Sequence, residues 1–505
     1  MLLRRASGRI FFGPIGAPAL FWNYFVYTNG HFLIDEQHQL DRRYVKFNVD
    51  VLCDVAAAAG GQTSPIVSIN KMEGGFSKAF LMRKADGTEV IAKIPFYLKT
   101  NTSVSVPRVL SWSPDSANPV GAEYIIMDKA RGVPLFERWG EMSEPKKLEL
   151  IRNLSKQEAQ FSGIQFPGLE GDTDSSKFCI GPTPDRTFYL DPTYDTIASS
   201  ADAVQGPWDT VSQLGISIIR RELSRLSTRP LHRPPTFYLG TIDERKQLLE
   251  STIPLMEMLD SNPTIRKVAQ PTLSHTDLHM GNIFVSAEDP SKIECLIDFQ
   301  SLCVMPAFLQ CQWPIFLKPP QEYTIGLVKP KLPENYEELD ENAKSFAKTE
   351  FNQAMRAKAY EIATNLENTP AYKPMILPRV FRELFTRCGE VSEFGVLPLR
   401  ACLIEFFQSW SDLGFTDTCP CPLSFTDQEI AEHEQQFQAY QDWHEAHRLA
   451  LEALETDAEG WISPQVDIVE KRKQNRELLG MFVEQMVKEK TEEEARRMWP
   501  FPDDS

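Results

Sequence analysis

Short apolar runs of β-prone residues dominate the first quarter of the chain. A stretch of helical composition at 47–59 comes first, with its apolar residues on one stripe. The tetrapeptide Ala-Asp-Gly-Thr at 85–88 has the composition of a hairpin turn between two of the runs. The pattern therefore predicts one helix followed by a small antiparallel sheet, whose strands cover residues 66–72, 79–83, 90–94 and 122–127.

From about Glu137 onward the apolar residues recur mainly at helical spacing. The segment 168–209 is rich in Gly, Pro, Thr and Asp, and it is predicted to be a long loop. Beyond Asp427 the chain is acidic and helix-prone, which is typical of a solvated helical face, so we expect a helical extension there. The candidate helices cover residues 144–161, 243–260, 346–366, 379–413, 429–455 and 466–498.

The most informative polar residues lie on two short segments near the middle of the chain. Residues 275–282 have the sequence HTDLHMGN, and residues 296–299 have the sequence LIDF. Apolar runs of strand character follow Asn282 and precede Asp298, with a polar turn at 286–291 between them. A hairpin of these two strands would bring Asp298 close to Asn282, so that both side chains reach one ion.

Asp277, Asn282 and Asp298 form the set of side chains that phosphoryl transfer from a nucleotide needs. One carboxylate orients the attacking hydroxyl and accepts its proton, and hard oxygen ligands hold Mg²⁺ against the phosphates. Any one such residue in a loop is more often a turn or cap residue. The two segments in this order, with apolar strands between them, favour the chemical interpretation.

The two segments resemble the H-x-D-x-x-x-x-N and I-D-x-x motifs of the aminoglycoside phosphotransferase and choline-kinase-like superfamily. Other segments resemble its fungal altered-inheritance-of-mitochondria phosphotransferase-like branch, namely 25–30, 121–127, 206–208 and 296–300. The resemblance covers most of the chain. It implies an α+β, bilobal protein-kinase-like fold, with a small antiparallel β N-lobe and a larger, mainly helical C-lobe that ends in a helical extension.

The resemblance also implies roles for the polar residues, with ATP and Mg²⁺ as cofactors and a small-molecule hydroxyl as acceptor. Asp277 would be the general base or would orient the hydroxyl, and Asn282 and Asp298 would ligate Mg²⁺. His275 and His279 would hold the loop rather than transfer protons.

A glycine-rich turn and a lysine on the predicted sheet are candidates for phosphate binding. Gly74, Gly75 and Ser77 lie between the first two strands, where backbone amides can approach phosphates closely. A Gly-Gly pair is more often a plain turn, and the chain has no Walker loop. Lys93 matches the third-strand lysine of kinase-like folds, which contacts the α- and β-phosphates. The alternative for Lys93 is an edge lysine that points to water.

Met127 is a candidate for adenine binding. It precedes residues 128–132, which resemble the hinge between the lobes of a kinase, where backbone groups bind the base. The alternative is an ordinary interdomain linker, and both interpretations can hold together.

The chain departs from the kinase pattern after Lys93. Only thirteen residues separate it from Pro107, and none of the residues 94–114 is Asp or Glu. A helix of about 11–12 residues that carries an acidic partner for the lysine does not fit there. Two interpretations stay open: either the segment is shortened in this chain, or the lysine is freed and nucleotide binding is weak or lost.

Two functions therefore compete. The first is an ATP/Mg²⁺-dependent phosphotransferase that acts on a small-molecule hydroxyl, and the retained Asp277, Asn282 and Asp298 favour it. The alternative is a non-catalytic, kinase-like mitochondrial scaffold, which the missing acidic partner of Lys93 favours. No A-P-E-like segment follows Asp298, which argues against a protein kinase. A third hypothesis is an acidic helical adaptor protein in which the motifs occur by chance.

The first 34 residues contain no Asp or Glu and carry Arg4, Arg5 and Arg9 among apolar residues. This composition is typical of a mitochondrial presequence (transit peptide), and the alternative is a tail that lacks acids by chance. Prolines and glycines interrupt the apolar stretch 10–27, so we expect no stable membrane span. We expect a mitochondrial protein with a presequence at 1–34, an N-lobe at 35–128, a C-lobe at 129–425 and an acidic helical extension at 426–505.

The charge and the cysteine content of the chain indicate which kinds of binding partner and cross-link to expect. The formal net charge of -17 argues against a general nucleic-acid binder, because a phosphate backbone would be repelled. The nine cysteines are scattered and odd in number, which does not indicate a disulfide framework. A nucleotide and a small-molecule hydroxyl remain the expected partners.

Overall fold

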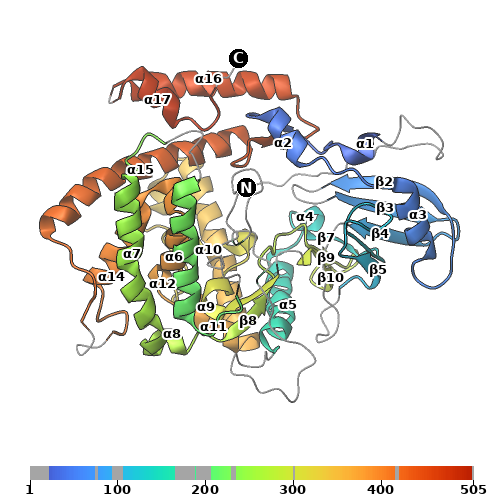
Figure 1. The fold of residues 1–505 in the computed structure, drawn as a ribbon, viewed down its shortest axis with the longest axis horizontal. Helices are drawn as coiled ribbons and strands as arrows, with labels where there is room; N and C mark the ends of the chain where they lie inside the picture. Colours follow the sequence, from blue (N-terminus) through green and yellow to red (C-terminus); the bar gives the residue numbers. More distant parts are fainter. Residues whose placement is uncertain are drawn as a thin grey trace.

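The protein folds into two lobes, one rich in β-strands and one mainly helical (Figure 1). The computed structural model describes residues 22–73, 78–93, 106–164, 183, 188, 206–228, 235–299, 302–415, 420–488 and 490–502. The α+β, bilobal kinase-like architecture expected from the sequence is confirmed. Most of the predicted loop 168–209 lies outside the described residues.

A five-stranded antiparallel sheet forms the centre of the N-lobe, with the order β2-β3-β4-β6-β5. The turn predicted at 85–88 joins β3 to β4, and Gly87 takes the positive φ of 86° that the turn requires. The four predicted strands are confirmed, whereas β5 was missed because its sequence, VLSWS, has no continuous apolar run. The strands are β2 (Ile66–Glu73), β3 (Lys78–Lys84), β4 (Glu89–Lys93), β5 (Val109–Ser113) and β6 (Tyr124–Asp128).

One helix, α3 (Val49–Ala58), covers the face of this sheet that lies away from the helical lobe (Figure 1). Asn48 caps the helix by accepting a hydrogen bond from the backbone N–H of Val51, at 3.1 Å. Its apolar stripe packs into the core of the N-lobe, so the other face of the sheet is left to meet the C-lobe. This core contains Leu52, Ala56, Phe80, Met82, Val90 and Ile126.

The C-lobe is a set of packed helices around two apolar cores. Helices α5 and α10 pack side by side in one part, and α6, α7, α12 and α14 pack in the other. The helices are α4 (Leu135–Arg138), α5 (Glu144–Ser162), α6 (Val211–Thr228), α7 (Ile242–Met258), α8 (Pro263–Arg266), α9 (Ala307–Gln310), α10 (Glu341–Glu367), α11 (Thr369–Met375), α12 (Arg379–Cys388), α13 (Val391–Phe394) and α14 (Val396–Gln408).

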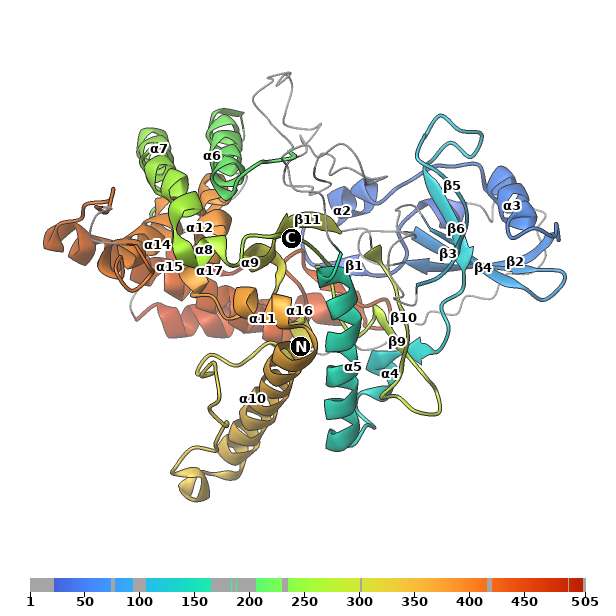
Figure 2. The ribbon, with the colours of Figure 1, turned by 90° about the horizontal axis from the view of Figure 1, so that it is seen from below.

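Two small sheets lie between the lobes (Figure 2). The predicted hairpin is confirmed as β9 (Ile283–Val285) and β10 (Ile293–Leu296), and β7 (Val133–Pro134) pairs with β9. β8 (Pro271–Ser274) pairs with β11 (Cys303–Pro306), so the HTDLHMGN segment runs from β8 to β9.

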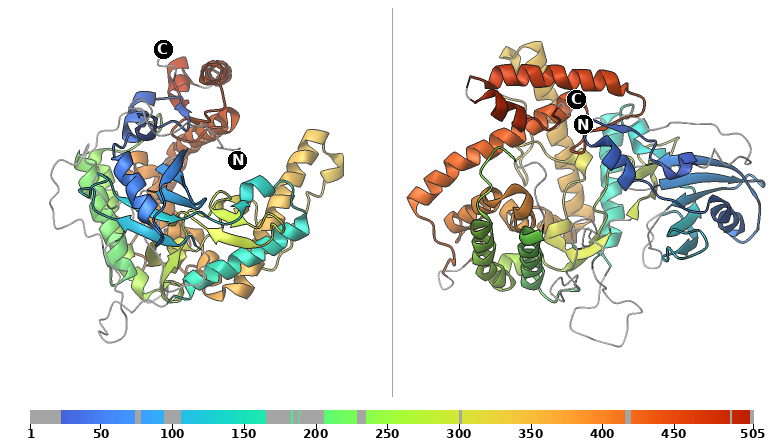
Figure 3. Two further views of the ribbon diagram at one scale, coloured as in Figure 1. Left: turned by 90° about the vertical axis from the view of Figure 1, so that its right-hand side faces the viewer. Right: turned by 45° about the horizontal axis from the view of Figure 1, so that its top comes forward.

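The C-terminal extension contacts both the C-lobe and the N-terminal segment (Figure 3). Its helix α15 (Asp427–Leu454) packs against α14, as expected. Its strand β12 (Trp461–Ile462) pairs with β1 (His31–Phe32), a contact that the sequence did not indicate. The remaining elements are α1 (Trp22–Phe25), α2 (Glu36–Arg42), α16 (Ile468–Met486) and α17 (Glu492–Met498).

Residues 22–34, which the sequence analysis placed in a presequence, are part of this packing. Tyr24 is buried in the core of the N-lobe, and Lys71 on β2 donates to the carbonyl of Asn23 at 2.8 Å. Removal of residues 1–34 would take away both β1 and this contact. A presequence therefore remains a proposal for the residues before Trp22. None of the described helices is both long and apolar enough to cross a bilayer.

Candidate active site

The HTDLHMGN segment forms a compact turn at the edge of the β9–β10 hairpin. The backbone N–H of His279 donates to the carbonyl of Asp277 at 3.1 Å, and that of Asn282 donates to the carbonyl of His279 at 3.0 Å. The Asn282 amide Nδ2 donates to the same Asp277 carbonyl at 2.9 Å. Asn282 is buried, whereas the side chain of Asp277 is half exposed. The turn thus exposes the carboxylate of Asp277 and buries the carboxamide of Asn282.

Asp298 lies beside Asn282, as the hairpin predicted. Leu296 is opposite Ile283 across the two strands, and the backbone N–H of Ile297 donates to the carbonyl of Asn282 at 3.0 Å. Asp298 has a positive φ of 68°, which is uncommon for a residue with a side chain. Such backbone conformations concentrate at functional sites, since the surrounding structure must hold them.

His275 ties the two segments together. Its Nε2 donates to the carbonyl of Ile297 at 2.8 Å, and its ring lies 4.8 Å from the ring of Phe299. Burial lowers the pKa of His275, so the ring is neutral at pH 7 and Nε2 carries the proton. The loop-holding role expected for His275 agrees with this geometry.

His279 packs against its own turn. Its Nδ1 accepts a hydrogen bond from the backbone N–H of Gly281 at 3.0 Å. Its Nε2 lies 3.9 Å from Oδ2 of Asp277, which is too long for a hydrogen bond. A side chain at position 281 would lie 2.8 Å from Cε1 of His279, so the ring keeps this position only if residue 281 is glycine.

Lys93, on β4 of the N-lobe, reaches across to the C-lobe segment. Its Nζ lies 2.7 Å from Oδ1 of Asp298, and the two side chains are 13% and 19% exposed. The sequence predicts that Lys93 contacts phosphates, and residues 94–114 offer it no acidic partner. The structure supplies Asp298 as that partner. No local sequence signal could have revealed this pair, because 204 residues separate its members.

Met127 lies on β6, and its contact with adenine stays a prediction. It lies opposite Ile91 on β4 and opposite Val109 on β5. Because strands flank it on both sides, its backbone N–H and C=O point into the sheet and not toward a ligand.

The glycine-rich turn with Gly74, Gly75 and Ser77 lies outside the described residues, as does the segment 94–105. The flanking strands are in register, with Glu73 opposite Lys78, so β2 and β3 form the hairpin that was predicted to carry this turn.

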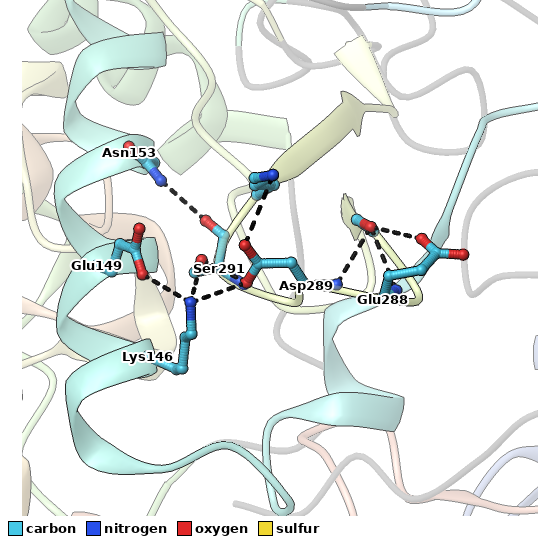
Figure 4. Close-up of polar contacts among 8 residues, drawn as sticks. Lys146, Glu149, Asn153, Glu288, Asp289 and Ser291 are labelled. Atoms are coloured by element: carbon cyan, nitrogen blue, oxygen red, sulfur yellow. Dashed lines mark hydrogen bonds and ion pairs between the residues drawn. The ribbon is translucent and has the colours of Figure 1, made fainter.

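The polar turn of the β9–β10 hairpin is fastened to helix α5 (Figure 4). Lys146 Nζ lies 3.1 Å from carboxylate oxygens of both Glu149 and Asp289. Asn153 Nδ2 donates to the carbonyl of Ser291 at 2.9 Å, and Ser291 Oγ donates to Asp289 at 2.7 Å. The hydrogen bonds from Ser291 and Lys146 lower the pKa of Asp289 to about 2. These contacts fix the hairpin and hence the spacing of Asn282 and Asp298.

The residues present fit a magnesium ion in their donor chemistry. The Asn282 amide nitrogen is used by Asp277, so its carbonyl oxygen is the atom suited to a cation. Asp298 adds a carboxylate that already has a cation, the ammonium of Lys93, beside it. Among the described residues no cluster of three or more His, Cys, Asp or Glu side chains could hold a metal. Mg²⁺ is usually bound by one or two carboxylates together with phosphates and water.

The chain is similar to several known proteins. Residues 96–309 match the Phosphotransferase enzyme family. A subtelomeric hrmA-associated cluster protein of Aspergillus fumigatus is 25% identical over 495 residues, which cover 85% of this chain and 96% of the relative. Altered inheritance of mitochondria protein 9, mitochondrial, of Kluyveromyces lactis is 22% identical over 435 residues, which cover 74% of this chain and 68% of the relative. The resemblance expected from the sequence is thereby confirmed.

Two solved phosphotransferases also align with the chain. The streptomycin-ATP-APH(2")-IIa ternary complex aligns with a TM-score of 0.32 and 16% sequence identity. The alignment covers 70% of this chain and 94% of the chain in that structure. The macrolide 2'-phosphotransferase MphH of Brachybacterium faecium aligns with a TM-score of 0.28 and 12% sequence identity. The alignment covers 68% of this chain and 97% of the chain in that structure.

Proposed function

Because residues 96–309 of this kinase-like chain match the Phosphotransferase enzyme family, we propose that the protein is an ATP- and Mg²⁺-dependent phosphotransferase that acts on a small-molecule hydroxyl. The observation that supports this most is the convergence of Asp277, Asn282 and Asp298 at one end of the β9–β10 hairpin, facing Lys93 from the N-lobe. Phosphoryl transfer relies mainly on positioning and charge stabilisation, and this arrangement offers both.

Each residue has a separate task in the proposed reaction. The half-exposed Asp277 carboxylate accepts the proton of the acceptor hydroxyl as its oxygen attacks the phosphorus atom. Lys93 places its ammonium against the phosphate oxygens of the nucleotide. Asn282 and Asp298 would hold Mg²⁺, which supplies positive charge to the phosphates when it is bound.

A non-catalytic scaffold is the second candidate, and the Lys93–Asp298 ion pair favours it. In a scaffold this pair would be permanent, since it engages both the phosphate-binding lysine and a metal ligand. In an enzyme the pair must open when Mg²⁺ and nucleotide bind. Nucleotide binding therefore distinguishes the two functions.

Calorimetric titration with ATP, in the presence and absence of Mg²⁺, tests the enzyme proposal on the full chain. We expect Mg²⁺-dependent binding by the unaltered protein and its loss in Asp298→Asn. Asp412→Asn, which removes an exposed carboxylate after α14, is the matched control and should bind normally. Equal and undetectable heats for all three proteins would leave the scaffold as the function.

Turnover tests the role of Asp277. With water as the acceptor, Asp277→Ala should slow release of ADP from ATP by about 10²–10⁴-fold while the affinity for ATP is preserved, because the carboxylate acts on the hydroxyl and not on the nucleotide. A coupled assay for ADP measures the rate, and calorimetry measures the affinity. A variant with unchanged turnover would remove the general base from the mechanism.

We also propose a mitochondrial location. The relatives named altered inheritance of mitochondria protein 9 carry the word mitochondrial in their names, and residues 1–21 of this chain have the composition of a presequence. Import of the full chain into isolated mitochondria should depend on residues 1–21. Import that is unaffected by their deletion would contradict the presequence.

A further inference from the structure

The two lobes are linked by more than the chain that runs directly between them. That chain passes from the N-lobe to the C-lobe between β6 and β7. A second link forms where the C-terminal extension meets the N-terminal segment of the protein (Figure 1). We call residues 22–48 and 427–488 together the brace. It has one anchor on each lobe and a joint between the two anchors.

Helix α15 anchors the brace to the C-lobe. Its Tyr440 is buried with Val396 and Leu397 of α14 and with Phe237. The ring of Trp443 stands edge-on to that of Phe237, with ring centres 5.4 Å apart. The 28 residues of α15 form a rod about 42 Å long. Because a hydrogen-bonded helix does not stretch, the far end of this rod moves with the C-lobe.

The N-terminal part of the brace is anchored to the N-lobe sheet. Tyr24 packs edge-on against Phe80 of β3, with ring centres 5.8 Å apart. Lys71 of β2 donates to the carbonyls of Asn23 and Val26, at 2.8 and 2.5 Å. These contacts combine apolar packing with hydrogen bonds from a charged group, so this part of the brace moves with the N-lobe.

Strands β1 and β12 form the joint between the two anchors. They pair in antiparallel register, and next to them the backbone N–H of Leu33 donates to the carbonyl of Gly460 at 2.9 Å. The indole Nε1 of Trp461 donates to the carbonyl of Asn29 at 2.9 Å. Leu33 also packs on an apolar cluster that contains Leu454, at the far end of α15. The joint therefore has both backbone hydrogen bonds and apolar contacts.

Opposite charges face each other across the joint. Arg472 of α16 lies 2.8 Å from Glu36 of α2, and Arg43 pairs with Glu459. The Arg43 side chain is only 11% exposed, and its guanidinium lies 4.7 Å from the ring centre of Phe32. A partly exposed ion pair contributes little by itself, so these pairs mainly align the two segments. A reversed charge on one side would instead repel the other side.

The joint and the two anchors together restrict how far the lobes can separate. Opening of the lobes about the crossing between β6 and β7 must part β1 from β12 or lift α15 from α14. Either change loses hydrogen bonds or buried apolar contacts, which favours the arrangement in which both are kept. In that arrangement Lys93 of the N-lobe lies 2.7 Å from Asp298 of the C-lobe. We propose that the brace limits opening of the lobes and holds them at the spacing that brings Lys93 to Asp298.

Double electron–electron resonance on the full chain measures the spacing of the lobes. Spin labels are carried by unnatural amino acids at Val67 of β2 and at Asp412 after α14, two exposed positions on different lobes. The measurement needs no nucleotide, so its outcome does not depend on the proposed phosphotransferase reaction. We expect a single narrow distribution of distances when the brace is intact.

Gly30→Ala should disrupt the joint. A Cβ at this position would lie 2.6 Å from the carbonyl oxygen of Ile462 and 2.3 Å from Nε1 of Trp461, so β12 must move away. We expect the distance distribution to shift and broaden. Gly121→Ala is the matched control, because Gly121 also has a positive φ but an added Cβ there would meet no atom within 4 Å. Its distribution should be that of the intact brace.

Arg472→Glu tests the joint without a clash at the backbone. It places two carboxylates against each other, and the distribution should shift in the same direction as in Gly30→Ala. The further change Glu36→Arg restores an ion pair of reversed sign and should return the distribution to its narrow form. Lys473→Glu, at the next position of α16, changes a lysine that lies 3.5 Å from Glu470 of the same helix. This control should leave the distribution as it is.

Three results would overturn the proposal. The first is a broad distribution in the protein with an intact brace. The second is a narrow, unchanged distribution in both Gly30→Ala and Arg472→Glu while circular dichroism shows both variants folded, since the lobes would then keep their spacing without the joint. The third is failure of Glu36→Arg to reverse the effect of Arg472→Glu, since that effect would then arise outside the joint.

Discussion

Lys93 illustrates how one residue can have a different neighbour from the one its local sequence suggests. Its strand context predicted a phosphate contact, and the nearby chain offered no acidic partner. In the folded protein its ammonium lies 2.7 Å from the Asp298 carboxylate, across the junction of the lobes. The same contact occupies a proposed metal ligand, so the lysine and a metal ion compete for Asp298.

Lys93→Met should therefore change nucleotide and metal binding in opposite directions. Affinity for ATP should fall by about 10- to 100-fold, because a hydrogen bond from a charged group contributes about 1.5–3 kcal/mol. Binding of Mn²⁺ alone should become tighter, because the Asp298 carboxylate is released. Calorimetry measures the first and electron paramagnetic resonance of Mn²⁺ the second. Lys267→Met, at an exposed position after α8, is the control. Weaker binding of Mn²⁺ by Lys93→Met would refute the competition.

Gly281→Ala should damage the proposed catalytic turn while the rest of the fold persists. The added Cβ would lie 2.8 Å from Cε1 and 3.0 Å from Nδ1 of His279, so the ring must move and its hydrogen bond with residue 281 breaks. We expect a loss of turnover of at least about tenfold, with a melting temperature lowered by only a few degrees.

Gly480→Ala provides the control for that substitution. Gly480 lies within α16, and an added Cβ there would meet no atom within 4 Å. This variant should be stabilised by about 0.5–1 kcal/mol, the usual gain of alanine over glycine in a helix, and its turnover should be unchanged. Equal turnover for both variants would show that the position of His279 does not matter.

Among the elements, the β9–β10 hairpin does most to assemble the site. It is held from one side by α5 through Lys146 and Asn153, and from the other by β7. Gly132 precedes β7 with a φ of 84°, and a Cβ there would lie 2.3 Å from the carbonyl oxygen of Val285 on β9. The close approach of these two backbones thus depends on glycine at position 132.

Gly132→Ala should destabilise the protein by several kcal/mol, because it adds a backbone clash to the strain of a positive φ. Gly121→Ala isolates the strain, since Gly121 has a φ of 76° and open space around an added Cβ. That control should cost about 1–2 kcal/mol. Urea unfolding measures both free energies. Similar losses for the two variants would show that β7 and β9 can separate without cost.

At the scale of the whole molecule, the C-terminal extension links the two ends of the chain. Strand β12 pairs with β1, Arg472 lies 2.8 Å from Glu36, and Arg43 pairs with Glu459. Helix α15 packs at the same time on α14 of the C-lobe. The extension therefore spans from the C-lobe to the segment that packs on the N-lobe sheet.

The attachment of α15 should make stability dependent on pH. Burial lowers the pKa values of His433 and His447 on this helix to about 4. The folded protein keeps both rings neutral to about pH 4, whereas the unfolded chain takes up protons from about pH 6.5. Acidification between these values therefore favours unfolding, by about 1–3 kcal/mol for each histidine.

Urea unfolding at several pH values between about 7 and 4 measures this slope. His433→Gln should flatten it, because one of the histidines that burial keeps neutral in the folded protein is gone. His38→Gln, at an exposed position on α2, should leave it as it is. A free energy of unfolding that does not fall with acidification would contradict the buried, neutral state of the histidines.

Local pattern was enough to predict much of the fold and the core of the site. Four of the five strands in the N-lobe sheet, the hairpin after Asn282 and the main helices were found from the spacing of apolar residues. The sequence also predicted that Asn282 and Asp298 lie close together, because the hairpin between them forms from residues that are near in the chain. β5 was missed, since half-buried strands with polar residues leave a weak pattern.

The sequence by itself determined that Asp277, Asn282 and Asp298, the proposed catalytic and metal-binding residues, lie close together, because they fall within 22 positions and short strands connect them. Only the tertiary structure decided that Lys93 lies against Asp298 and that β1 pairs with β12. Contacts between residues that are near in the sequence follow from rules that act over a few residues. The other contacts depend on how distant segments pack, and neither periodicity nor spacing along the chain encodes that.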